Sequence, residues 1–193
     1  MTNVFIIHGT YGNPEENWLP WLKNEVKKIG HNAFVPKFPT PEGQNLKSWV
    51  KVFDNYLKYL DKDSVVVGHS TGATFLLSIL ERHAAGAAFF VSGFTGKFEE
   101  KHADPRLDEI NEAFNKTFTE REFDWHAIRK NCSKFFVYHS DNDPYVPIGK
   151  AEELAVSLDT HVIVIKGAGH FNADAGYIKF ERLFEDIKSV LNK

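Results

Sequence analysis

Residues 65–77 read VVVGHSTGATFLL, and this stretch decides the fold. Three consecutive valines are typical of a strand that is buried on both faces. After Ser70, apolar residues recur at the three- and four-residue spacing of a helix. Between the two lies the pentapeptide Gly68-His69-Ser70-Thr71-Gly72, a G-x-S-x-G sequence. A strand, this turn and a helix in that order predict a sharp turn that presents Ser70 outward as a nucleophile.

The two glycines of this turn predict close packing of the backbone. The turn is so sharp that side chains at Gly68 and Gly72 would collide with neighbouring backbone, and Ser70 itself is strained. The first residues of a helix also have unpaired N–H groups. We therefore expect the amide of Thr71 to stabilise an oxyanion beside Ser70. The alternative, a glycine-rich turn with an inert serine, is disfavoured by the strand and helix on either side.

The same alternation of short apolar runs and longer amphipathic segments extends along the chain, which indicates βαβ units and a mainly parallel sheet. The predicted strands are Val4–His8, Asn32–Val35, Ser64–Gly68, Ala87–Val91, Lys134–His139 and His161–Ile165. The predicted helices are Trp18–Ile29, Leu46–Leu60, Thr71–His83, Ile148–Leu158 and Ala175–Leu191. We therefore expect one compact α/β domain over residues 1–193, without linkers or repeats.

Residues 92–132 interrupt this alternation, because about 40 residues separate two predicted strands where most connections are far shorter. The segment contains helix-like pieces at Leu107–Asn115 and Phe123–Asn131. Its aromatic residues are Phe94, Phe98, Phe114, Phe118, Phe123 and Trp125. Two interpretations remain open. The helices bury these aromatics on the sheet, or the segment is a small cap that supplies the walls of an apolar pocket, with Phe94 contacting substrate.

The composition excludes several classes of protein. A chain of 193 residues that is 42% hydrophobic suits one domain with a proper core. The net charge of -3, with scattered basic residues, does not favour nucleic-acid binding. Cys132 is the single cysteine, which excludes an intrachain disulfide and a cysteine-based metal site. The N-terminus lacks a secretory signal pattern, and no stretch reaches the length of a membrane span. We expect a soluble cytoplasmic protein.

A serine nucleophile needs a histidine base and a carboxylate that orients the imidazole. In the expected fold both follow the serine, in loops at the carboxyl ends of later strands. His170 lies in such a loop, and Gly167 and Gly169 before it allow a tight turn that brings the imidazole back over the sheet. The acid is Asp143 or Asp141. Pro144 favours Asp143 by holding it extended, although either carboxylate suits an ordinary turn residue.

The loop after the first predicted strand begins His8-Gly9-Thr10-Tyr11-Gly12. A glycine turn at the carboxyl end of a central strand is where open α/β sheets bind ligands, and in this kind of fold the loop supplies a second oxyanion amide. We assign that amide to Thr10 and expect Tyr11 to form a wall of the pocket. His8 is interpreted as a structural residue beneath the loop.

Four segments together resemble the small α/β-hydrolases of the retinoblastoma-binding serine hydrolase family. They are His8-Gly9-Thr10, Gly68-His69-Ser70-Thr71-Gly72, Asp143-Pro144-Tyr145-Val146-Pro147 and Gly169-His170-Phe171. The resemblance covers nearly the whole chain. It implies an α/β-hydrolase fold, a three-layer α/β/α sandwich with six parallel strands and a minimal cap. It also implies a Ser-Asp-His triad with Asp143 as the acid. Thr10-Tyr11 stands where many lipases and esterases have further glycines, and no large lid is present, so hydrolysis of long-chain triglycerides is not expected.

The expected chemistry is acyl transfer by Ser70, with His170 as base and no metal or cofactor. Tyr11, Phe94 and Phe171 are the predicted contacts of a small-molecule acyl substrate. A carboxylic ester is favoured because esters need the least assistance to the leaving group. Amide or thioester hydrolysis, and a non-catalytic binding protein on the same fold, are the alternatives.

Overall fold

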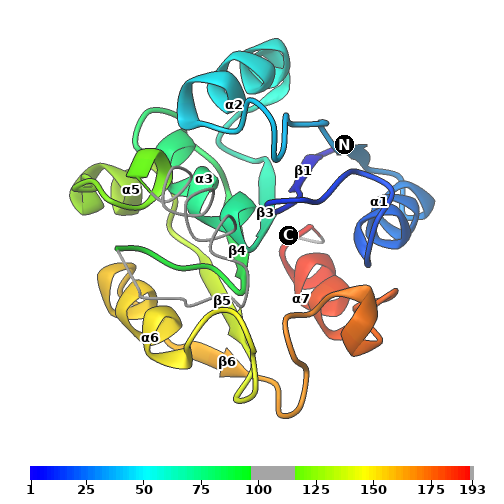
Figure 1. Cartoon of the computed structure of the whole chain (residues 1–193). Helices are drawn as coiled ribbons and strands as arrows, with labels where there is room; N and C mark the ends of the chain where they lie inside the picture. Colours follow the sequence, from blue (N-terminus) through cyan, green and yellow to red (C-terminus); the bar gives the residue numbers. More distant parts are fainter. Residues whose placement is uncertain (97–115, 192–193) are drawn as a thin grey trace.

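The computed structural model describes residues 1–96 and 116–191 and has a six-stranded parallel sheet at its centre (Figure 1). The strands are β1 (Asn3–Ile7), β2 (Asn32–Phe34), β3 (Val65–His69), β4 (Ala87–Val91), β5 (Phe135–His139) and β6 (Val162–Val164). They lie in the order β2-β1-β3-β4-β5-β6, and every neighbouring pair is parallel. The six predicted strands and the fold class are confirmed, with strand ends shifted by at most one residue.

Helices cover both faces of the sheet and make it a three-layer sandwich (Figure 1). The helices are α1 (Leu19–Lys28), α2 (Leu46–Phe53), α3 (Thr71–Leu80), α5 (Trp125–Asn131), α6 (Ile148–Ser157) and α7 (Glu181–Leu191), with the 3-10 helices η1 (Asp54–Tyr59) and η2 (Ala173–Ala175). Side chains of β1 alternate between the layers. Phe5 and Ile7 pack with α2, α3, α5 and α6, whereas Val4 and Ile6 pack with α1 and α7.

The five predicted helices are shorter in the structure, and two of them differ most from the prediction. The helix expected over Leu46–Leu60 ends at Phe53, where the amide of Asn55 donates to the carbonyls of Lys51 (3.3 Å) and Val52 (3.1 Å) and the chain continues as η1. Asparagine competes with the backbone for such bonds and so disfavours further α-helix. The helix expected over Ala175–Leu191 begins only at Glu181, because Gly176 adopts a left-handed conformation that ends η2.

The described part of the 92–132 segment packs its aromatic residues on the core. Phe118 is buried, and its ring centroid lies 5.0 Å from that of Trp49 in α2. Phe123 and Ile128 belong to the same cluster. The predicted helix Phe123–Asn131 corresponds to α5, whereas Leu107–Asn115 lies outside the described residues. The described aromatics thus follow the packing interpretation, and the cap role of the segment stays a prediction.

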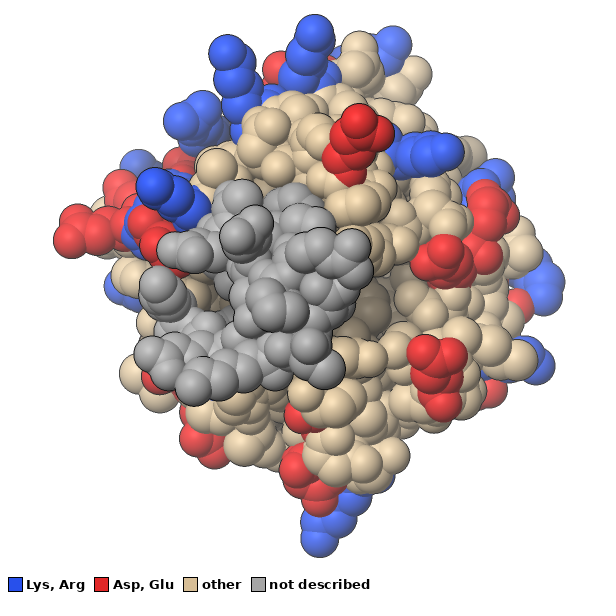
Figure 2. Space-filling view, in the orientation of Figure 1, with Lys and Arg blue, Asp and Glu red and all other residues tan. Residues whose placement is uncertain are grey.

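Charged side chains of both signs are spread over the surface. Among the residues that Figure 2 colours by charge, the charged side chains on this face lie mainly toward the periphery. Within residues 1–96 and 116–191, no helix is both long enough and apolar enough to cross a lipid bilayer.

Candidate active site

Ser70 lies at the tight turn between β3 and α3. Its backbone has φ 54° and ψ -124°, a conformation that residues other than glycine rarely adopt. The serine N–H donates to Val91 of β4 (2.8 Å), and its carbonyl accepts from Ala73 (2.9 Å). These bonds hold the strained residue in place.

The glycines around Ser70 allow this turn to form. A Cβ atom at Gly68 would lie 2.5 Å from the Cα of Ala73, and one at Gly72 would lie 2.4 Å from the carbonyl oxygen of His8. Both distances are shorter than real Cβ contacts. The predicted need for glycine at the two positions is confirmed, and the reason is the close approach of α3 to β1 and β3.

Thr10 and Thr71 lie together beside the turn. Their side-chain oxygens are 2.7 Å apart, and the amide of Gln44 donates to Thr10 Oγ1 (2.8 Å). Within the part of the chain that the structure describes, the backbone N–H groups of Thr10 and Thr71 have no hydrogen-bond acceptor. An oxyanion hole needs backbone N–H groups that are free to donate, and the role of these two amides as oxyanion donors stays a prediction.

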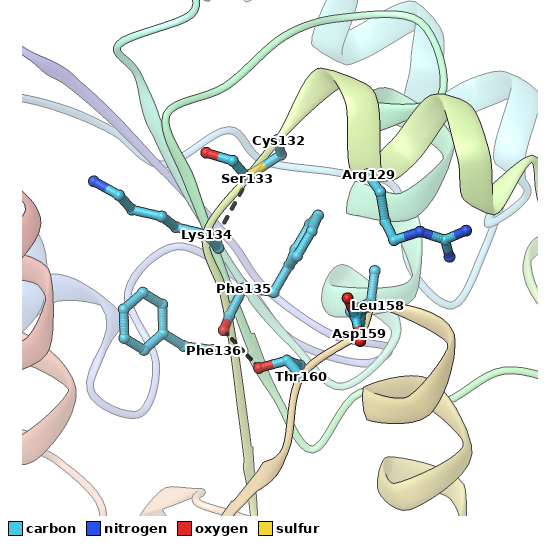
Figure 3. A pocket seen from close by; sticks show the side chains of 9 residues that line it. All are labelled: Arg129, Cys132, Ser133, Lys134, Phe135, Phe136, Leu158, Asp159 and Thr160. Carbon is cyan, nitrogen blue, oxygen red and sulfur yellow. Dashed lines mark hydrogen bonds between the residues drawn. The ribbon is translucent and has the colours of Figure 1, made fainter.

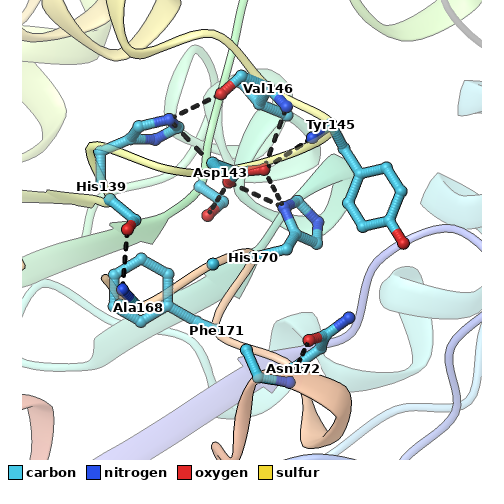
Figure 4. Close-up of polar contacts among 12 residues, drawn as sticks. His139, Asp143, Tyr145, Val146, Ala168, His170, Phe171 and Asn172 are labelled. Atoms are coloured by element: carbon cyan, nitrogen blue, oxygen red, sulfur yellow. Dashed lines mark hydrogen bonds and ion pairs between the residues drawn. The ribbon is translucent and has the colours of Figure 1, made fainter. Parts of the chain in front are cut away.

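The imidazole of His170 pairs with Asp143 (Figure 4). Its Nδ1 lies 2.9 Å from Oδ2 and 3.0 Å from Oδ1 of the carboxylate, whose side chain is 1% exposed. Asp141 is exposed, and its carboxylate accepts instead from the backbone N–H of Gly167 (2.8 Å). The structure therefore brings Asp143, and not Asp141, to the histidine.

The Asp143 carboxylate is held in its charged form. Burial raises the pKa of Asp143, but the hydrogen bond and charge of His170 and the backbone N–H groups of Tyr145 and Val146 outweigh burial and lower it. Tyr145 N and Val146 N lie 2.9 and 3.1 Å from Oδ1. A charged carboxylate at Nδ1 keeps the proton on that nitrogen and leaves Nε2 to accept one.

The turn formed by residues 167–170, called here the His170 turn, contacts His69, the residue before Ser70. The His69 ring lies 4.9 Å from that of His170, and His69 Nε2 donates to the carbonyl of His170 (2.7 Å). Trp18 Nε1 donates to the carbonyl of Phe171 (3.0 Å). Gly169 has φ 55°, so the predicted glycine turn is present. Among the described residues, the hydroxyl of Ser70 has no hydrogen-bond partner, so no hydrogen bond joins Ser70 to His170 in this structure.

Residues 140–142 hold residues 167–169 from the other side. The three consecutive N–H groups of the His170 turn donate to side-chain oxygens of this loop. The pairs are Gly167 with Asp141 (2.8 Å), Ala168 with Ser140 (2.9 Å) and Gly169 with Asn142 (2.8 Å). The loop after β5 therefore supplies both the carboxylate and the support of the histidine turn.

His69 is a neutral hydrogen-bond donor. Burial and the nearby charge of His170 lower the pKa of His69 to about 3, although its bond to the His170 carbonyl acts in the opposite direction. The imidazole is 4% exposed. Its Nε2–H can therefore hold the His170 turn at any pH well above 3.

Because His69 is buried in its neutral form, the free energy of unfolding should depend on pH. The unfolded chain protonates His69 near its ordinary pKa of 6.5, whereas the folded protein does not, so acid favours unfolding. Between pH 7 and pH 5 the free energy of unfolding should fall by about 2 kcal/mol more in the parent than in His69→Gln. Urea denaturation at the two pH values measures the difference. His126→Gln, which replaces an exposed histidine, serves as control and should behave as the parent. Equal pH dependence in parent and His69→Gln would contradict this account.

The predicted substrate contacts lie in different surroundings. Phe171 is fully buried and stacks on Phe180 in the cluster of α1 and α7, with ring centroids 5.1 Å apart. Its predicted role as a substrate contact is wrong, because the residue has a left-handed backbone (φ 52°) and its ring lies in the core. Tyr11 is 47% exposed, and Phe94 is buried with its carbonyl bound to Thr74 Oγ1 (2.6 Å). Substrate contact by Tyr11 and Phe94 stays a prediction.

Sequence reasoning missed Tyr145 and Ser92. The half-exposed ring of Tyr145 lies edge-on to His170, with centroids 5.1 Å apart. Its only sequence signal is its place two residues after Asp143. Ser92 donates a hydrogen bond to Asp143 Oδ2 (2.8 Å) from the end of β4. No local motif marks this serine.

A cavity of about 450 Å³ lies at the other end of β5 (Figure 3). Its lining residues are Arg129, Cys132, Ser133, Lys134, Phe135, Phe136, Leu158, Asp159 and Thr160. The cavity is at the amino end of the strand, whereas open α/β sheets bind ligands at the carboxyl ends. Ser70, Asp143 and His170 do not line it, and we assign it no role in the site.

A parallel six-stranded sheet with a strained serine turn after a central strand, and a histidine–aspartate pair in later loops, defines an α/β-hydrolase. The chain belongs to the serine hydrolase family, since the family model described as Serine hydrolase matches residues 4–189. It is 25% identical to Serine hydrolase RBBP9 of Rattus norvegicus over 193 residues, covering 98% of this chain and 96% of that protein. The predicted resemblance is therefore confirmed.

Two bacterial proteins resemble this chain in sequence or in fold. The chain is 28% identical over 194 residues to YdeN of Bacillus subtilis (strain 168), covering 98% of this chain and 96% of YdeN. The crystal structure of YdeN superimposes with a TM-score of 0.87 over 100% of both chains. Est1E from Butyrivibrio proteoclasticus, 20% identical, shares the fold with a TM-score of 0.71 over 100% of this chain and 89% of Est1E.

Proposed function

We propose that this protein hydrolyses carboxylic esters of small acyl groups, with Ser70 as nucleophile, His170 as general base and Asp143 as the residue that orients the base. One observation carries the proposal. His69 adjoins Ser70 in sequence, and its side chain donates a hydrogen bond to the carbonyl of His170. The strained serine is therefore connected through His69 to the His170–Asp143 pair. The family membership supports hydrolysis, and ester specificity is the further step.

In the proposed reaction, His170 Nε2 takes the proton of Ser70 as Oγ attacks the carbonyl carbon. The backbone N–H groups of Thr10 and Thr71 bind the oxyanion of the tetrahedral intermediate. His170 then gives its proton to the leaving alcohol, and Ser70 keeps the acyl group. Water attacks the acyl-serine with His170 again as base, which releases the acid and restores Ser70. Such serine–histidine contacts often form only in the substrate complex.

Three further features belong to the proposal. An ester is preferred over an amide because an alcohol leaves with less assistance from His170. The substrate is a small molecule, with Tyr11 and Phe94 as its predicted contacts. The one cysteine, Cys132, is buried and free, which suits a reducing compartment such as the cytoplasm.

Labelling with a fluorophosphonate probe tests the nucleophile. The parent should be labelled and should hydrolyse p-nitrophenyl acetate, and Ser70→Ala should do neither. Ser133→Ala removes an exposed serine at the opposite end of β5 and should be labelled as the parent is. An unlabelled parent, or a Ser70→Ala variant that labels equally well, would show that the assignment is wrong. Faster turnover of p-nitroacetanilide than of the ester would change the substrate class to amides.

A further inference from the structure

Ser92 is a strained and fully buried residue directly after β4. Its side chain is 0% exposed, and its backbone has φ 48°. Its N–H donates to the carbonyl of Tyr138 in β5 (3.0 Å). A left-handed serine in a buried strand end has an energetic cost that surrounding structure must offset. Such residues cluster at functional sites, so the hydrogen bonds of the Ser92 hydroxyl can indicate whether Ser92 serves the active site.

The hydroxyl of Ser92 contacts the carboxylate of Asp143. Its Oγ lies 2.8 Å from Oδ2, and because a charged carboxylate only accepts, Ser92 is the donor. The two backbone donors to this carboxylate, Tyr145 and Val146, both bind Oδ1. In the described part of the chain, Ser92 and His170 are therefore the hydrogen-bond donors to Oδ2.

The other imidazole near Oδ2 does not replace Ser92. His139 is buried, and its Nε2 lies 3.9 Å from Oδ2 but donates to the carbonyl of Val146 at 2.8 Å. Burial lowers the pKa of His139, so this ring is a neutral neighbour. Without the hydroxyl of Ser92, the remaining described donor to Oδ2 would be His170 itself, the residue that the carboxylate has to orient, and the backbone donors Tyr145 and Val146 would hold Oδ1 alone.

We propose that Ser92 is a positioning residue that acts through Asp143 to hold the imidazole of His170 in its working orientation. The inference rests on the proposed function, because it assigns Ser92 to the same site. The hydroxyl fixes the plane of the carboxylate, so that both oxygens face Nδ1 of His170. Ser92 itself does not touch the reacting atoms.

Removing the hydroxyl should slow the chemical step and leave substrate binding unchanged. Ser92→Ala is expected to lower kcat for p-nitrophenyl acetate about tenfold or more, since a hydrogen bond to a charged group is lost. KM should stay close to that of the parent. Ser92→Gly should give the same loss, and because glycine adopts a positive φ without strain, this variant should fold even if Ser92→Ala does not.

The matched control is Ser64→Ala. Ser64 is also fully buried, and its hydroxyl also donates to a carboxylate, that of Asp61 (2.8 Å), but it lies before β3 at the opposite end of the sheet. This variant should lose stability while keeping the kcat of the parent. A fall in kcat of Ser64→Ala as large as that of Ser92→Ala would show a general packing effect and overturn the inference.

A spectroscopic measurement separates this inference from the proposed function. Proton NMR of the parent should show a downfield signal from the Nδ1 proton of His170, shared with Asp143. In Ser92→Ala and Ser92→Gly the signal should move upfield or broaden through exchange with water, and in Ser64→Ala it should not change. This result needs no turnover, so it stands even if Ser70 proves unreactive. An unchanged signal together with unchanged kcat in both Ser92 variants would overturn the positioning role.

Discussion

Asp143→Asn is expected to lower kcat for an activated ester by about 10⁴-fold, the effect of losing the carboxylate of a serine–histidine–aspartate triad. The asparagine amide has one oxygen where Asp143 has two, and four donors converge on that carboxylate. Either the NH₂ group faces one of these donors, or the imidazole takes the tautomer with the proton on Nε2. In the second case Nε2 no longer accepts the proton of Ser70.

Asp141→Asn is the matched control, because the residue lies two positions away in the same loop. Asp141 uses only Oδ1, as acceptor for Gly167 N–H, and an asparagine keeps that oxygen. Its kcat should therefore stay within a few-fold of the parent. Steady-state kinetics with p-nitrophenyl acetate compare the two variants. A larger loss in Asp141→Asn would move the acid to that residue, and near-parental kcat in both would remove the carboxylate from the mechanism.

Local signals in the sequence predict most of the fold and part of the site. The apolar runs match the strands because buried parallel strands must be apolar on both faces. The turn at Ser70 is predictable because its geometry requires glycine at Gly68 and Gly72. Chain order predicts that His170 pairs with an acid of the loop after the fifth strand, since both lie at the carboxyl edge of the sheet, and the family resemblance favours Asp143 over Asp141.

The remaining features depend on contacts between distant segments. Ser92 is 51 residues from Asp143 in the sequence, and only the pairing of β4 with β5 brings them together. Phe171 follows the predicted base and suggests a substrate contact, but the residue has a left-handed backbone and its ring lies in the core. His69 occupies the first variable position of the G-x-S-x-G sequence. Its hydrogen bond to the His170 carbonyl depends on the position of the loop after β6, which the sequence around His69 does not specify.

Gly72→Ala should cause the largest loss of stability of any substitution considered for this protein. The new Cβ would lie 2.4 Å from the carbonyl oxygen of His8, 2.6 Å from that of Ile7 and 3.0 Å from the carbonyl carbon of His8. All three atoms are backbone, so no side-chain rotation relieves the clash. They belong to β1 and its end, and β1 cannot shift freely because it pairs with β2 on one side and β3 on the other.

Helix propensity acts in the opposite direction but is too small to compensate. Alanine in place of glycine inside a helix favours folding by up to about 1 kcal/mol. Overpacking costs about 1–3 kcal/mol and occasionally more, and a clash with backbone atoms that cannot rotate away belongs at the upper end of that range. Gly149→Ala isolates the first effect, because Gly149 lies in α6 and a Cβ there meets no atom within 4 Å. Urea denaturation should show Gly149→Ala as stable as the parent or more stable, and Gly72→Ala less stable by at least about 2 kcal/mol, the difference of the two effects. Parental stability of Gly72→Ala would mean that α3 can withdraw from β1, and the Thr71 amide would then not be fixed beside Ser70.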